Sequence, residues 1–153
     1  MGGLIITNLA TDDTLVSRNK IKGLVLLNTP VFFWDIKRVL INIFNDFRTK
    51  SLVNIMRYLN GAKIPMKSMI DFQSILKKTK PIFSDICVPT FIAQGLKDDA
   101  VKYKSAKFIY DKIIIKQKNL IYYKNSGHLI CASEDKDMLF VDILLFVNSI
   151  LTI

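Results

Sequence analysis

The chain has 153 residues, of which 50% are hydrophobic and 23% are charged, and its formal net charge is +9. This apolar content excludes a disordered chain and favours one packed domain. The lysines are spread along the chain without clustered arginines or interleaved aromatics, so we expect no specific nucleic-acid partner. A compositional bias explains the charge, and weak attraction to an anionic membrane or nucleic acid is the alternative.

The first half of the chain predicts three helical stretches and one strand. Apolar residues recur at helical spacing over residues 2–12. The continuous apolar run 21–28, ended by a Thr-Pro pair, is typical of a strand buried on both faces. From residue 31 to about 63 the pattern is helical and rich in aromatic residues, and a further amphipathic helix is expected over 69–83.

The second half alternates strands with helices. A strand is expected over 88–95, a helix over 104–114, a strand over 119–125 and a closing helix over 134–150. Strands separated by helices pair in parallel through right-handed crossovers. The sequence therefore predicts an α/β fold with about three parallel strands and flanking helices.

The apolar C-terminal tract and the two cysteines bear on the compartment. The tract is shorter than the roughly 20 residues that span a bilayer and is interrupted by Asp142 and Asn148, so a buried helix is expected, with no transmembrane segment. Cys87 and Cys131 lie far apart, and one histidine cannot complete a metal set with them. We expect small buried thiols, a cytoplasmic location, and no metal or cofactor.

Polar residues follow two of the predicted strands. Asp98 comes after strand 88–95, and His128 comes after strand 119–125. The carboxyl ends of neighbouring parallel strands share one edge of a sheet, so the two side chains are candidates for contact. A carboxylate beside an imidazole is the arrangement of a general base. The alternatives are that Asp98 and Asp99 cap a helix and that His128 is a polar turn residue.

These segments resemble the α/β-hydrolase superfamily, most closely its small bacterial carboxylesterases and monoacylglycerol-lipase-like members. The family's acid follows a strand in the pattern G-x-x-D-x-x-V, matched here at Gly95, Asp98 and Val101, and its base ends an S-G-H turn, matched at His128. The resemblance implies a partial α/β-hydrolase fold as a single domain over residues 1–153. It also implies a helical cap inserted at residues 31–68.

The start of the chain, MGG, resembles the end of the family's G-x-S-M-G-G nucleophile elbow. On this alignment the serine would immediately precede Met1. In the family the backbone N–H of the residue after the serine donates to the oxyanion, and Met1 holds that position here. The nitrogen of Met1 is a terminal ammonium in this chain instead of an amide. The serines at positions 105, 126 and 133 do not lie in a glycine-flanked elbow. We therefore expect a chain that begins just after its own nucleophile.

The resemblance implies the C-terminal fragment of a serine carboxylesterase that hydrolyses carboxylic, acylglycerol-like esters. This fragment would keep the acid Asp98 and the base His128, lack the nucleophile, and be inactive alone. Its expected partner is a small acyl-ester substrate, and it needs no cofactor. The alternative is a non-catalytic interaction module, because strand 21–28 would lose its neighbour and expose a sheet edge. Self-association or a complementing N-terminal half would cover that edge.

Overall fold

The computed structural model describes residues 1–12, 14, 20–32 and 66–152, with the backbone alone at 66–69. The chain divides into one unit made of Met1–Phe33 with Ile75–Ile153 and a second unit, Trp34–Ser74. The predicted cap at 31–68 lies almost wholly outside the described residues. Val31 and Phe32, at its predicted start, form a bend instead of a helix.

The larger unit contains a sheet of three parallel strands, as predicted. The strand order is β1-β2-β3, and Leu24 of β1 and Lys118 of β3 both pair with Thr90 of β2. The elements in chain order are α1 (Gly2–Ala10), β1 (Leu24–Leu27), α5 (Met66–Ile82), η1 (Phe83–Asp85), β2 (Thr90–Gly95), α6 (Lys104–Lys112), β3 (Lys118–Tyr123), η2 (Ile130–Ala132) and α7 (Lys136–Leu151). Of these, α5 begins in the second unit.

Strands β1 and β2 are shorter than predicted. β2 begins two residues late because Pro89 has no N–H to donate to a ladder. The carbonyl of Pro89 accepts a hydrogen bond from the N–H of Leu24 at 2.8 Å, which sets the start of β1. At the other end Asn28 has φ of 44°, which turns the backbone out of the strand.

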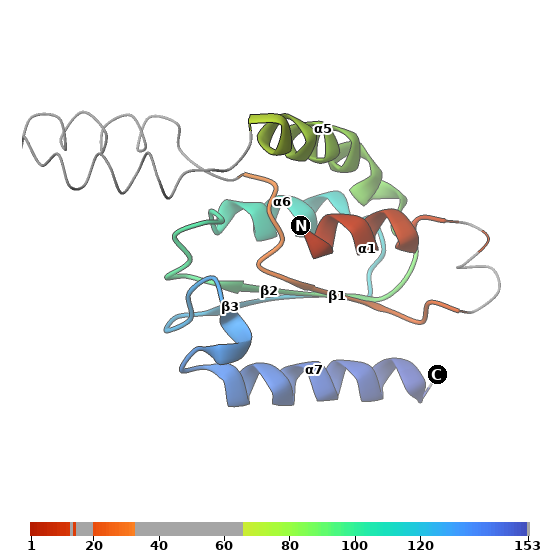
Figure 1. The fold of residues 1–153 in the computed structure, drawn as a ribbon. Coiled ribbons are helices and arrows are strands. Elements are labelled where there is room, and N and C mark those ends of the chain that lie inside the picture. Colours follow the sequence, from red (N-terminus) through yellow and green to blue (C-terminus); the bar gives the residue numbers. More distant parts are fainter. Residues whose placement is uncertain (13, 15–19, 33–65, 153) are drawn as a thin grey trace, which may run out of the picture. The chain divides into compact units, whose positions relative to one another are not determined.

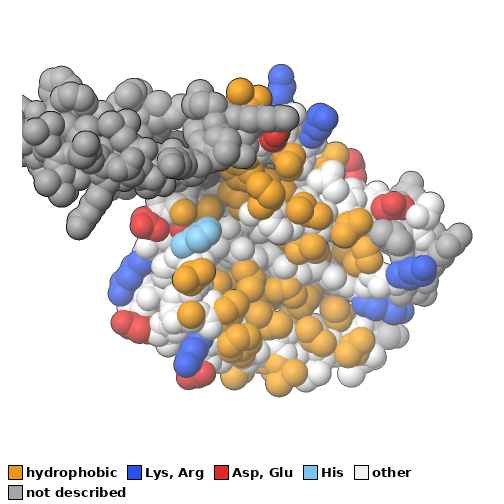
Figure 2. Space-filling model, viewed as in Figure 1, with side chains coloured by type: hydrophobic (Ala, Val, Ile, Leu, Met, Phe, Trp, Pro, Cys, Tyr) orange, Lys and Arg blue, Asp and Glu red, His pale blue; other side chains and the backbone are white. Residues whose placement is uncertain are grey.

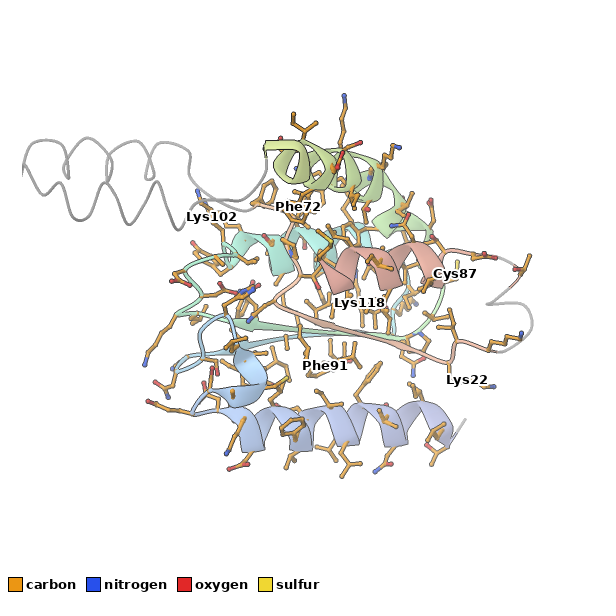
Figure 3. All side chains as sticks on the ribbon, viewed as in Figure 1. Lys22, Phe72, Cys87, Phe91, Lys102 and Lys118 are labelled. Atoms are coloured by element: carbon orange, nitrogen blue, oxygen red, sulfur yellow. The ribbon has the colours of Figure 1, made fainter. Side chains whose placement is uncertain are left out.

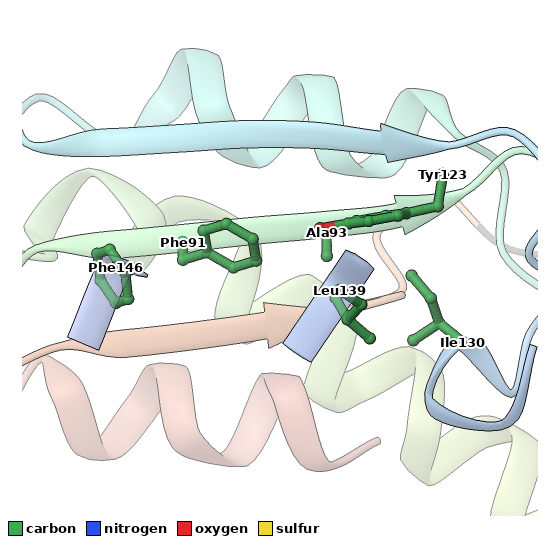
Figure 4. Close-up of a cluster of buried hydrophobic side chains, with 6 residues drawn as sticks. All are labelled: Phe91, Ala93, Tyr123, Ile130, Leu139 and Phe146. Atoms are coloured by element: carbon green, nitrogen blue, oxygen red, sulfur yellow. The ribbon is translucent and has the colours of Figure 1, made fainter. Parts of the chain in front are cut away.

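Helices cover both faces of the sheet, with α1 and α6 on one side and α7 on the other (Figure 1). Every residue of the central strand β2 is buried. Between β2 and α7 the rings of Phe91 and Phe146 lie 5.7 Å apart, and Leu139 packs into the same cluster (Figure 4). Burial of such side chains stabilises the fold by about 1.5–3 kcal/mol each. The core between the sheet and α7 therefore supports β2 and β3, the strands that precede Asp98 and His128.

Helix α7 is less buried than the sequence predicted. Only Leu139 and Phe146 are buried, because apolar residues occur all round this helix and one stripe alone can face the sheet. Its exposed apolar residues are Met138, Phe140, Val141, Leu144, Leu145 and Leu151. Apolar side chains also gather over α1 and the β1 side of the sheet (Figure 2). Within the described ranges, no helix has the length and apolar character needed to cross a bilayer.

The prediction that both cysteines are buried is wrong. Cys87 and Cys131 are exposed (Cys87 is labelled in Figure 3). Cys87 lies between Ile86 and Val88, whose side chains take the buried positions of that loop. In η2 the buried position is taken by Ile130. Each thiol therefore points away from the core because its larger aliphatic neighbours occupy it.

Candidate functional site

Asp98 and His128 meet at the carboxyl ends of β2 and β3. Nδ1 of His128 lies 3.1 Å from Oδ2 of Asp98. The Asp98 side chain is fully buried, whereas that of His128 is 50% exposed and visible at the surface in Figure 2. With Nδ1–H donating to the carboxylate, Nε2 is left free to accept a proton. The pair therefore has the geometry of a general base held by a carboxylate.

Asp98 is fixed by its own turn. Its Oδ1 accepts hydrogen bonds from the backbone N–H groups of Ala100 and Val101, both at 2.8 Å. The proposed alternative, a helix cap, does not apply to α6, whose N-cap residue is Tyr103 and has no side-chain cap bond. One carboxylate oxygen thus anchors the loop, and the other is directed at His128.

The loop that carries His128 is tied to the start of α7 through Asp135. Its carboxylate accepts the N–H of Asn125 at 2.7 Å and the hydroxyl of Ser126 at 3.0 Å. Desolvation acts to raise the pKa of Asp135, but these hydrogen bonds outweigh it and lower the pKa below its usual value. Their contribution to stability is therefore present at neutral pH and is lost as the pH falls through this lowered pKa.

The three serines considered above are bonded elsewhere. The hydroxyl of Ser126 is buried against Asp135, and that of Ser105 donates to the carbonyl of Phe32. The hydroxyl of Ser133 donates to the carbonyl of Leu129 at 2.9 Å. Each of these serines therefore stabilises a loop.

His128 and Met1 line one hollow of about 370 Å³, formed by residues 1–3, 27–30 and 128–132. The carbonyl of Met1 accepts a hydrogen bond from the N–H of Leu4. This bond lies in the first turn of α1, at the edge of the hollow. A Cβ added at Gly3 would lie 2.1 Å from Oγ1 of Thr29. The second glycine of MGG therefore lets α1 approach the end of β1.

Asn28 is the site residue that sequence reasoning missed. Its Oδ1 accepts the N–H of Gly95 at 2.8 Å, and its Nδ2 donates to the carbonyls of Gly127 and His128 at 3.0 and 2.7 Å. The available signal was an asparagine directly after a buried strand, since asparagine tolerates positive φ better than most residues.

We expect Gly95→Ala to lower the free energy of unfolding by about 1–3 kcal/mol. The added Cβ would lie 2.4 Å from the carbonyl oxygen of Ser126 and 2.8 Å from that of Gly127, and both are backbone atoms. Urea unfolding measures the change. The control is Gly2→Ala, because nothing lies within 4 Å of a Cβ there. Equal stability of the two variants would contradict the close approach of these loops.

Comparison with known proteins finds curated relatives and many similar structures. No protein-family model matches the chain. The carboxylesterase of Bacillus subtilis (strain 168) is 27% identical over 88 residues, which are 58% of this chain and 36% of that protein. The monoacylglycerol lipase of Paleococcus ferrophilus has a TM-score of 0.66 at 14% identity, over 96% of this chain and 65% of its own.

A structure described for LipS and LipT, two metagenome-derived lipolytic enzymes, has a TM-score of 0.67 at 15% identity, over 97% of this chain and 62% of its own. The chain thus spans about a third of this carboxylesterase and less than two thirds of these two structures. At such identities the structural likeness establishes the fold. The chain therefore carries part of the α/β-hydrolase fold, and the proteins that it resembles include a carboxylesterase in sequence and lipolytic enzymes in structure.

Proposed function

We propose that this chain supplies the acid and the base of a serine carboxylesterase acting on acylglycerol-like esters. The observation that carries the proposal is the 3.1 Å contact between the buried carboxylate of Asp98 and the half-exposed imidazole of His128. The similarity to a carboxylesterase and to lipolytic enzymes supports the ester chemistry. The free, exposed thiols of Cys87 and Cys131 fit a cytoplasmic protein.

In the proposed reaction, Nε2 of His128 takes the proton of a serine hydroxyl as the serine oxygen attacks the ester carbonyl. The tetrahedral intermediate collapses to an acyl-serine, and the imidazolium returns the proton to the leaving alcohol. His128 then takes a proton from water, whose oxygen attacks the acyl group to give a second tetrahedral intermediate. This intermediate collapses to the carboxylic acid as the imidazolium returns the proton to the departing serine oxygen. Asp98 stabilises the imidazolium during both steps.

The proposed serine lies outside the 153 residues, next to Met1. The hollow shared by Met1 and His128 supports this, because a serine preceding Met1 would enter on the same side as the imidazole. In a longer chain the nitrogen of Met1 would be an amide N–H and could donate to the oxyanion. On this proposal the chain alone lacks the nucleophile, and removal of one such donor costs about a further 10²- to 10³-fold in kcat, so the chain is expected to be inactive alone.

The test compares the isolated chain with the same chain fused behind the strand and Gly-x-Ser elbow of a related carboxylesterase. A chromogenic short-chain ester should be hydrolysed by the fusion only, and turnover should be lost in the fusion with His128→Ala and in the fusion whose added serine is alanine. Two results contradict the proposal: turnover by the isolated chain that His128→Ala abolishes, or a folded fusion without turnover.

We also propose the alternative role of an interaction module, on one specific observation. Within the described part of the chain, β1 lies at the sheet edge and pairs only with β2. Exposed apolar residues flank this edge on α1, at Ile5, Ile6 and Leu9, and on α7. Unpaired strand edges are templates for pairing with another chain. A second copy of the chain is the occupant that we propose for the isolated protein.

A further inference from the structure

Asn28 joins the ends of all three strands. It is 5% exposed. Among the residues that the structure describes, it is the one non-glycine residue with positive φ. A residue continuing β1 would direct its side chain above or below the sheet. The left-handed turn instead lets the carboxamide reach sideways to Gly95, the last residue of β2, and to Gly127 and His128, after β3.

The carboxamide uses both kinds of hydrogen-bonding group. Its oxygen accepts from Gly95 at the end of β2, three residues before Asp98, and its nitrogen donates to two successive carbonyls of the loop after β3. Two backbone hydrogen bonds also join the ends of β2 and β3, from Leu96 N–H to the carbonyl of Tyr123 and from Lys97 N–H to that of Ser126. Neither of these two bonds involves His128. In the described ranges, the hydrogen bond to the backbone of His128 comes from Asn28.

We propose that Asn28 is a positioning residue that orients His128 toward Asp98. The Nδ2 of Asn28 donates to the carbonyl oxygen of His128 at 2.7 Å and so fixes the backbone of this residue. The orientation of that backbone sets the direction in which the imidazole side chain points. By accepting from Gly95, Asn28 ties that direction to the loop of the carboxylate. The proposal deepens the proposed function and rests on it for the catalytic use of His128, but the orientation itself is a property of this chain.

The test uses the one histidine of the chain as a spectroscopic probe. In a ¹⁵N-labelled sample with a neutral imidazole, the nitrogen shifts of the ring report which nitrogen carries the proton. Contact with Asp98 favours Nδ1–H. Asn28→Gly tolerates positive φ and removes the carboxamide, and Asn28→Asp keeps the acceptor for Gly95 but removes both donors. We expect both variants to move most of the way to the tautomer ratio of Asp98→Ala.

The matched control is Asn8→Ala. The Nδ2 of Asn8 also donates to two partners, the carbonyl of Leu4 at 2.7 Å and the hydroxyl of Thr79 at 3.1 Å. Its loss should leave the tautomer ratio at the wild-type value even where it lowers stability. Folded Asn28 variants with the wild-type ratio would overturn the proposal, because a purely structural role changes stability and leaves the ring unaffected.

A second measurement keeps the test decisive if neither variant folds. In the wild-type spectrum the carboxamide protons of Asn28 should exchange slowly with water, since both are bonded in a buried position. Fast exchange in the folded chain would overturn the proposal. Neither readout depends on ester turnover, so failure here and failure of the proposed esterase function are separate results.

Discussion

In the chain completed with a nucleophile, Asp98→Asn is expected to lower kcat by about 10⁴-fold. The reason lies in the two N–H groups that already donate to Oδ1 of Asp98, from Ala100 and Val101. An asparagine would keep its oxygen at these donors, so its NH₂ group would face Nδ1 of His128. That nitrogen would then have to be an acceptor, and Nε2 would carry the proton. An imidazole in this tautomer cannot take the proton of the serine.

The control is Asp99→Asn, which makes the same chemical change one residue further on, at an exposed position. It should retain wild-type kcat. The ¹⁵N shifts of His128 provide an independent readout in the isolated chain, where Asp98→Asn should place the proton on Nε2. A retained kcat, or an unchanged tautomer in the folded Asp98→Asn chain, would refute the role given to Asp98.

The isolated chain is expected to self-associate through β1, and Leu144→Glu is expected to abolish this association. A two-fold axis at the sheet edge would pair β1 with its copy in antiparallel fashion and bring α7 beside the partner's α7. Asp142 of α7 bonds Tyr123 of β3 at 2.7 Å, so that side of the helix faces β3. At 100° per residue, Phe140 and Leu144 lie on the side toward β1.

An unpaired carboxylate buried at this contact costs several kcal/mol, and each 1.4 kcal/mol is tenfold in affinity. We therefore expect the dimer dissociation constant to rise by about 10³-fold or more. Leu145→Glu is the matched control, because Leu145 is similarly exposed but turned away from β1. Light scattering over a range of concentrations gives the mass. A wild-type chain that is monomeric at every concentration would contradict the proposal, as would equal effects of the two variants.

The order of the elements could be predicted because hydrophobic periodicity is local. The alternation of apolar runs and helical patterns gave three parallel strands between helices, and the rule that parallel strands end at one edge gave the contact of Asp98 with His128. The ends of β1 could not be predicted in the same way. They depend on Pro89 in a distant segment and on the backbone turn at Asn28.

Burial was the less predictable property, since it depends on neighbours that the local pattern does not contain. Helix α7 has enough apolar residues for a fully buried helix, but the described sheet covers only the stripe with Leu139 and Phe146. The function of Asn28 was hidden for the same reason. Its three partners lie 67 to 100 positions away in the sequence, and they meet only when the sheet has formed.

The pairing of Leu24 with Thr90 closes a long loop that contains the whole of Trp34–Ser74. The entropy lost on closing such a loop grows only with the logarithm of its length, by about 0.6 kcal/mol for each doubling. The sheet that holds Asp98 and His128 is therefore nearly insensitive to the length of this segment. Insertions and deletions in this segment can accumulate during evolution at little thermodynamic cost. The pairing of β1 with β2 on either side of it must be kept.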